Sequence, residues 1–113
     1  MNYNEMSDFE INKRVAELHF NATKAFKGND IDESVTVLGE KVYSNFNPCN
    51  NPNHAWSIIV ENRISISPHS IESEDNWEAS VWCSGEWGTV DVWNKNPLRA
   101  ACIVYLMMQE AKC

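Results

Sequence analysis

The sequence predicts a single α+β domain over residues 1–113, with a mostly antiparallel sheet packed by an N-terminal helix and a largely buried C-terminal helix. Three observations predict this class. A capped amphipathic segment opens the chain, stretches rich in β-branched and aromatic residues fill its middle, and an uncharged apolar stretch closes it. The length suits one domain with one hydrophobic core.

The first helix is expected from about Asp8 to about Phe20, with an extension toward Phe26 left open. Ser7 followed by Glu10 is a capping box, in which the hydroxyl accepts a hydrogen bond from an amide of the first turn. Apolar residues then recur at helical spacing, with charged residues on the other side. These apolar residues are Ile11, Val15 and Leu18.

The middle of the chain alternates strand signals with turn signals. Ser34–Leu38 and Lys41–Phe46 are expected to form a hairpin. The stretch NPCNNPNHA, residues 47–55, holds two prolines and four asparagines and is predicted to be a polar loop without regular structure. A short helix from about Ala55 to Glu61 and a strand in RISIS, residues 63–67, are expected after it.

The C-terminal segment carries the clearest helix signal. Asn96 is a good cap, and Pro97 is favoured at the first helical position. From Ala100 to Met108 there are nine apolar residues without a charge. A membrane helix needs about 18 such residues, so this stretch is expected to be a helix surrounded by protein and packed on the sheet.

Four of the five tryptophans lie in NWEASVWCSGEWGTVDVW, residues 76–93. A two-residue turn at Gly85-Glu86, with the glycine first, predicts a type II′ hairpin. Its register pairs Ser84 with Trp87, Trp82 with Thr89, Ser80 with Asp91 and Glu78 with Trp93. The opposite pleat is small and apolar, and it suits covering by the terminal helix; it holds Ala79, Val81, Cys83, Val90 and Val92.

Two interpretations of the tryptophans stay open. In the first, they only stabilise the sheet, since each aromatic cross-strand pair adds about 0.2–1 kcal/mol. In the second, Trp82, Trp87 and Trp93 form a partly open aromatic surface beside Asp91 and Glu78. Stacking a base on such a ring contributes about 1–3 kcal/mol, and aromatic residues dominate the hot spots of protein interfaces.

The loop at 47–55 and the residue that follows it offer a second candidate. Asparagine amides such as that of Asn53 can hydrogen-bond a ligand, while Trp56 can stack on it. The alternative is that the asparagines, which also include Asn47 and Asn50, only satisfy their own backbone in tight turns.

Composition argues against several partners. Sixteen acidic residues outweigh nine scattered basic ones, for a net charge of −7. Phosphate backbones need clustered Lys and Arg, so we expect no broad nucleic-acid binding and no binding to anionic membranes. The start of the chain has no secretory signal pattern. The four cysteines form no C-x-x-C pair, so no metal site is expected.

No motif indicates catalysis. The chain has no G-x-S-x-G, P-loop, G-x-G-x-x-G or paired-histidine pattern, and no cofactor is expected. His54, Cys49 and Asp91 are only loose candidates for an active site, which would have to assemble in space. We therefore expect that the protein is not an enzyme.

Three blocks resemble a known family: MSDFEINKRVA near the start, FNPCNNPNHAWSIIVENRISISP in the middle and NPLRAACIVYLMMQEA near the end. Together they look like the NinX-like proteins of tailed bacteriophages, which are grouped as a domain of unknown function. The resemblance implies an accessory early gene product that acts in the cytoplasm of the host bacterium. It supplies no catalytic residues.

The sequence thus favours a non-enzymatic phage accessory protein that engages a host protein through an acidic, tryptophan-bearing surface. A small nucleotide-like molecule is the alternative ligand, although its phosphates would need Arg63, Lys95 or Arg99 nearby. A third interpretation makes the aromatic face a homodimer interface.

Overall fold

The computed structural model describes residues 2–21, 24–28, 32–72, 74–83 and 88–111. The elements in these residues follow the order helix, strands, helix, strands, helix. They are η1 (Tyr3–Glu5), α1 (Asp8–His19), β1 (Lys24–Lys27), β2 (Val35–Leu38), β3 (Val42–Phe46), α2 (Pro52–Glu61), β4 (Ser65–Pro68), β5 (Trp77–Trp82), β6 (Thr89–Asn94) and α3 (Pro97–Ala111). The predicted α+β class is confirmed.

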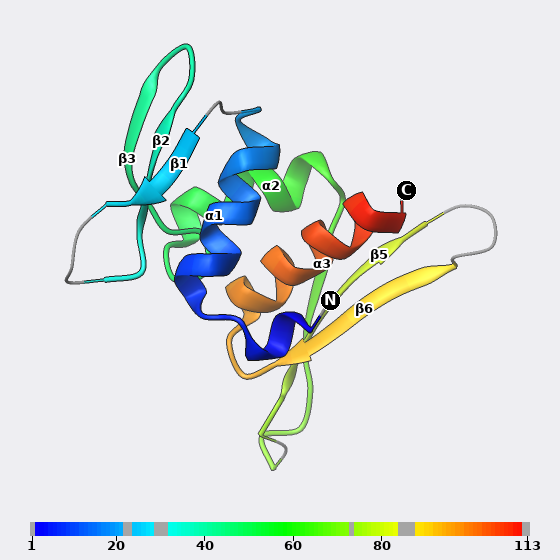
Figure 1. Cartoon of the computed structure of the whole chain (residues 1–113). Helices are drawn as coiled ribbons and strands as arrows, with labels where there is room; N and C mark the ends of the chain where they lie inside the picture. The colour runs from blue at the N-terminus through cyan, green and yellow to red at the C-terminus, as the bar shows by residue number, and fades with distance from the viewer. Residues whose placement is uncertain (1, 22–23, 29–31, 73, 84–87, 112–113) are drawn as a thin grey trace.

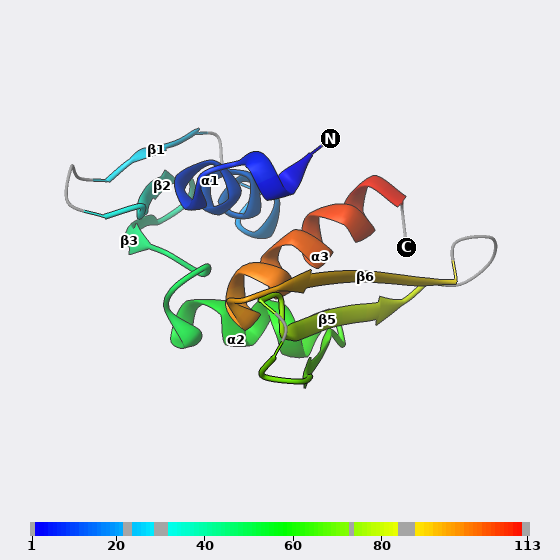
Figure 2. The ribbon, with the colours of Figure 1, turned by 90° about the horizontal axis from the view of Figure 1, so that it is seen from below.

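The strands divide between two antiparallel sheets, β1-β2-β3 and β4-β5-β6. Helix α1 packs on the first sheet and α3 on the second, and the two helices contact each other (Figure 1). Figure 2 shows α3 between α1 and strands β5 and β6, with α2 also near it. The sequence indicated antiparallel pairing but not the separation into two sheets, which follows from the two helices each covering one of them.

Helix α1 begins as the sequence predicts. The Ser7 Oγ accepts a hydrogen bond of 3.1 Å from the Glu10 amide, and the buried side of the helix includes Ile11 and Val15. The open extension toward Phe26 is not helical, because Lys24–Lys27 forms β1 and pairs with β2.

Helix α2 begins three residues before the expected start. Asn51 is its N-cap and accepts a hydrogen bond of 2.9 Å from the Asn53 amide, and Pro52 occupies the first helical position. Proline suits that position because the missing N–H would have no partner within the helix. The expectation that all of residues 47–55 lack regular structure is therefore wrong for residues 52–55.

Helix α3 is the centre of the core. Every residue from Ala100 to Leu106 is buried, which confirms the expected burial of this helix. Its cap is the predicted one, since the Asn96 Oδ1 accepts hydrogen bonds from the amides of Leu98 at 2.9 Å and Arg99 at 3.3 Å. Small side chains at positions 100–102 let neighbouring elements approach the helix closely.

We expect the substitution Ala101→Leu to lower the free energy of unfolding by about 1–3 kcal/mol, because Ala101 is buried at a packed helix surface and extra methylenes force neighbours to move. Urea denaturation measures the change. The control, Gln109→Ala on the exposed side of α3, should stay within about 0.5 kcal/mol of the wild type. An unchanged midpoint for Ala101→Leu would mean that this position is not tightly packed.

Candidate functional site

The β5–β6 hairpin has the register that the sequence predicts. Trp82 pairs with Thr89, Ser80 with Asp91 and Glu78 with Trp93. The predicted turn at Gly85-Glu86 and the pairing of Ser84 with Trp87 lie outside the described residues. The structure therefore confirms the shared face of Trp82, Asp91 and Trp93 and does not place Trp87.

One face of the β4-β5-β6 sheet is covered by α3. Ala79, Val81, Cys83 and Val92 are buried on that pleat, and α3 contacts both β5 and β6. This agrees with the expected role of the small apolar pleat. Since successive side chains of a strand point to opposite faces, the remaining side chains lie on the face away from α3.

We call that second face the outer face. It consists of Ser65, Ser67, Glu78, Ser80, Trp82, Thr89, Asp91 and Trp93. The Trp82 side chain is 74% exposed and Trp93 is 42% exposed. Trp82 pairs with Thr89 and not with an aromatic residue, so the described pairing gives it no aromatic cross-strand partner.

The side chains around Trp93 are held in place by contacts among themselves. The Trp93 Nε1–H donates a hydrogen bond of 3.2 Å to the Asp91 carboxylate. The His69 ring lies 4.2 Å from the Trp93 ring, centroid to centroid, and its Nε2 lies 3.1 Å from a Glu78 oxygen. This arrangement places two carboxylates beside an oriented aromatic ring, and such a surface suits a cationic side chain, which is attracted by both.

The asparagines of the 47–55 segment serve the fold. Asn12, fully buried on α1, donates to the Glu33 carbonyl at 2.9 Å and to the Asn47 Oδ1 at 2.8 Å, and its own oxygen accepts from the Cys49 amide at 3.1 Å. The Asn50 amide donates to Asp8 at 3.0 Å and to Asn47 at 3.1 Å. These bonds favour the interpretation that the asparagines satisfy neighbouring polar groups.

The start of α3 joins the same network. The Asn96 amide donates to the Cys49 carbonyl at 2.8 Å. The Arg99 guanidinium forms an ion pair with Asp8 and donates to the carbonyls of Tyr3 at 3.2 Å and Met6 at 2.7 Å. Arg99, which the sequence offered as a phosphate ligand, is thus occupied within the protein. The sequence also predicted no role for Asn12, because its hydrogen-bond partners are distant in sequence and no neighbouring residue indicates them.

Asn53 and Trp56 lie on the surface of α2. Asn53 is exposed, and Trp56 is 66% exposed beside the exposed Val60, one helical turn further on. Among the described residues, no hydrogen bond or ring contact joins Asn53 or Trp56 to the outer face. They lie on a helix, whereas Trp82 and Trp93 lie on strands β5 and β6.

The loose catalytic candidates do not come together. The His54 Nδ1 accepts a 2.9 Å hydrogen bond from the backbone N–H of Asn47. The His54 Nε2 lies 3.3 Å from the side-chain nitrogen of Asn51. The buried Cys49 thiol contacts Cys102, and this hydrogen bond, together with burial, raises the pKa of Cys49 and disfavours the thiolate. Among the described residues, no hydrogen bond or ring contact joins either residue to Asp91 on β6.

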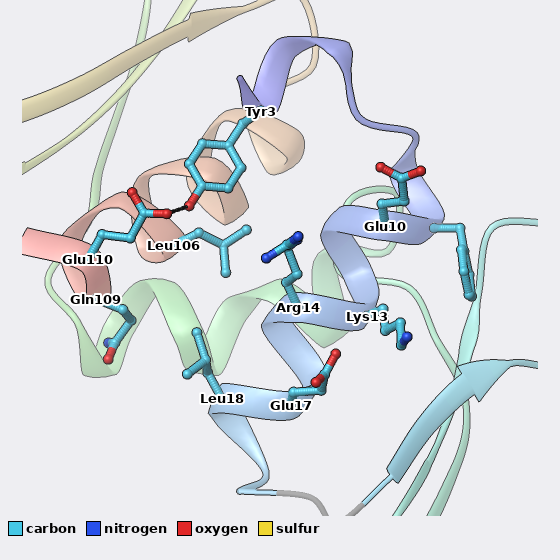
Figure 3. A pocket seen from close by; sticks show the side chains of 10 residues that line it. Tyr3, Glu10, Lys13, Arg14, Glu17, Leu18, Leu106, Gln109 and Glu110 are labelled. Carbon is cyan, nitrogen blue, oxygen red and sulfur yellow. Dashed lines mark hydrogen bonds between the residues drawn. The ribbon is translucent and has the colours of Figure 1, made fainter. Parts of the chain in front are cut away.

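A hollow of about 640 Å³ lies between α1 and α3 (Figure 3). The Tyr3 hydroxyl donates to Glu110 there, and burial followed by this hydrogen bond raises the pKa of Tyr3 to about 12. Figure 3 shows Arg14 directed into the hollow near Leu106. The walls mix charges of both signs, namely Glu10, Lys13, Arg14, Glu17 and Glu110, and the sequence gave no signal for this site.

The described residues lack two further kinds of site. They contain no group of His, Cys, Asp or Glu side chains arranged to hold a metal ion. They also contain no helix with the length and apolar character required to span a bilayer.

The fold and the open sheet face define a small α+β protein with an exposed, acidic and aromatic surface. A solved structure of a phage protein from Bacillus cereus ATCC 14579 has the same fold, with a TM-score of 0.67 and 16% identity over 95% of this chain and 91% of that chain. No curated protein matches the chain. The family model described as bacteriophage P22 NinX matches residues 2–109, and the chain belongs to this family.

We expect Asn12→Ala to lower the free energy of unfolding by about 2–4 kcal/mol, because it leaves the Cys49 amide and the Glu33 carbonyl without their partner. Chemical denaturation measures the loss. The control, Asn53→Ala, removes an exposed side chain and should change stability by less than about 0.5 kcal/mol. Similar losses for both variants would contradict a structural role specific to Asn12.

Stability should also depend on the protonation of His54. Burial lowers the pKa of His54 below its ordinary value of 6.5, so the unfolded chain binds more protons than the folded one as the pH falls below that value. The free energy of unfolding should therefore fall from about pH 6.5 downward until the folded-state pKa has been passed.

His54→Asn keeps an acceptor for the Asn47 amide but cannot titrate in this range. Melting curves recorded from about pH 7 to about pH 5 should show a flatter pH dependence for this variant than for the wild type. Parallel curves would show that His54 does not contribute to the acid sensitivity.

Proposed function

We propose that this NinX-family protein is a non-enzymatic phage accessory protein that binds a protein of the host in the bacterial cytoplasm. The contact surface is the outer face of the β4-β5-β6 sheet. The observation that carries the proposal is the exposure of Trp82 and Trp93 on one ordered face that no described element covers.

Exposed tryptophans contribute strongly to protein interfaces. Each supplies a large apolar area with few rotatable bonds, and truncation of such an anchor typically costs at least about 2 kcal/mol of binding free energy. Water contact with Trp82 is unfavourable in the free protein, so covering this side chain with a partner gains free energy. A binding surface explains this exposure better than a sheet-stabilising role does.

The charge of the outer face indicates the chemistry of the partner. Glu78 and Asp91 flank Trp93, while the whole chain has a net charge of −7. A basic surface with Lys or Arg side chains complements both features, because it pairs with the carboxylates and stacks on the indole rings. The acidic surplus also accelerates the encounter with such a partner.

A nucleotide-like ligand has less support. Of the three basic residues that the sequence offered for its phosphates, Arg99 is bound to Asp8 and to the backbone carbonyls of Tyr3 and Met6. Asp91 and Glu78, which lie beside the rings that would stack a base, repel phosphate. A protein partner is therefore the function that we favour.

Affinity capture tests the proposal. Immobilised protein is incubated with soluble extract of the host, and the retained proteins are compared between wild type and the double variant Trp82→Ala, Trp93→Ala. We expect the wild type to retain a partner and the double variant to bind it at least roughly 30-fold more weakly. Circular dichroism verifies that the double variant is folded.

The matched control is Trp56→Ala, which removes an indole from α2 whose exposure of 66% lies between those of Trp82 and Trp93. It should retain the partner as the wild type does. Loss of the partner with Trp56→Ala, but not with the double variant, would transfer the site to α2. A protein that is dimeric in solution, and becomes monomeric in the double variant, would assign the outer face to self-association.

A further inference from the structure

Strand β6 forms an open edge of its sheet. In the order β4-β5-β6 it pairs with β5 alone, along all six of its residues. Edge strands of natural proteins are usually protected from further pairing by proline, by lysine or by a covering segment. The residues of β6 include neither proline nor lysine, and Asp91 is their single charge.

The hydrogen-bond pattern shows which backbone groups lie at this edge. The Cys83 amide donates to the Gly88 carbonyl at 2.6 Å, which makes these two residues a hydrogen-bonded pair. Such pairs alternate along an antiparallel ladder, so Val90 and Val92 bond to β5. Thr89, Asp91 and Trp93 therefore direct their N–H and C=O groups away from β5. No hydrogen bond from another described residue occupies these groups.

Two hollows adjoin this edge and share Asp91 and Met107. They measure about 410 Å³ and about 310 Å³. Their apolar side comes from β6 and α3 and includes Val92, Ile103 and Met107. Asp75, Asp91 and Glu110 supply carboxylates, and none of the residues that line either hollow is Lys or Arg.

We propose that β6 accepts an extended segment of the partner as a further strand of the β4-β5-β6 sheet. This inference rests on the proposed function and specifies the chemistry of the partner. The segment alternates basic and apolar side chains. Its basic side chains lie on the outer face, near Asp91 and Trp93, and its apolar side chains enter the hollows toward Met107 and Ile103.

A second copy of β6 fits the edge less well. Antiparallel pairing of two β6 strands about Asp91, whose backbone groups face the edge, brings the two Asp91 carboxylates directly opposite each other, and like charges in that position are destabilising. Each copy also carries a net charge of −7. Charge complementarity therefore selects a basic segment from a different protein.

The test uses a synthetic peptide of seven residues that alternates valine and lysine, blocked at both ends. Titration into ¹⁵N-labelled protein should shift the amide signals of Thr89, Asp91 and Trp93 and slow their hydrogen exchange. The amides of Val90 and Val92, which already bond to β5, should change less. The same peptide with glutamate in place of lysine should not bind.

N-methylation separates strand addition from simple charge attraction. Only alternate amides of an added strand face β6, so methylating either the lysine amides or the valine amides should abolish binding, while methylating the other set leaves it intact. If both methylated peptides bind as well as the parent peptide, the proposal is wrong.

Two variants at one position provide a second test. Asp91→Asn removes the charge and should weaken binding about two- to five-fold. Asp91→Pro also removes an amide that does not bond to β5, a position where a sheet tolerates proline, and should weaken binding at least tenfold more than Asp91→Asn. Equal affinities for the two variants, with both folded, would overturn the role of the backbone.

The two proposals can fail separately. Host-protein capture that depends on Trp82 and Trp93, without any peptide-induced protection of β6, would refute strand addition and leave the proposed function intact. Peptide binding at β6, without any host protein retained by the wild type, would refute the proposed function instead. A dimer whose Thr89, Asp91 and Trp93 amides are protected without peptide would replace the basic segment by a second copy.

Discussion

The burial of α3 on every side determines how the other helices and strands are arranged. A helix whose residues from Ala100 to Leu106 are all buried requires a layer on each face, and a single sheet can supply only one. Strands β5 and β6 cover one side, while α1 and α2 cover others. The first sheet then packs on α1 rather than on α3. The division of the strands between two sheets follows from this demand for cover.

Hydrogen bonds fix how these layers meet. The segment before α2 lies between the first turns of α1 and α3, and the backbone amides and carbonyls of its non-helical residues need partners outside a helix. Asn12 and Asn96 satisfy such groups around Cys49, and Arg99 binds carbonyls at the start of the chain. A polar segment of asparagines thus joins three helices, because each amide side chain can donate and accept at once.

Local signals predicted most of the elements. Ser7 and Asn96 act through residues a few positions away, so the caps could be obtained from sequence. The β5–β6 register could be obtained by assuming a turn at Gly85-Glu86 and pairing the residues on either side of it. Pro52 was misread because proline suits both a loop and the first turn of a helix. The contacts of Asn12 and Arg99 could not be predicted, because their partners are distant in sequence. The alternation of side chains along a strand likewise predicted which face of the sheet Trp82 lies on. Its exposure could not be predicted, because it depends on which elements cover that face.

The edge at β6 gives the acidic composition a further role. A strand kept open for pairing cannot carry the lysine or proline that usually prevents stacking into fibre-like assemblies. Protection of this edge against self-association must then come from the charge of the whole molecule. A net charge of −7 keeps identical copies apart at a distance, whereas it favours the approach of the basic segment that we propose for the same edge. If the proposed segment binds there, colloidal stability and partner choice derive from one property, and ionic strength affects both together.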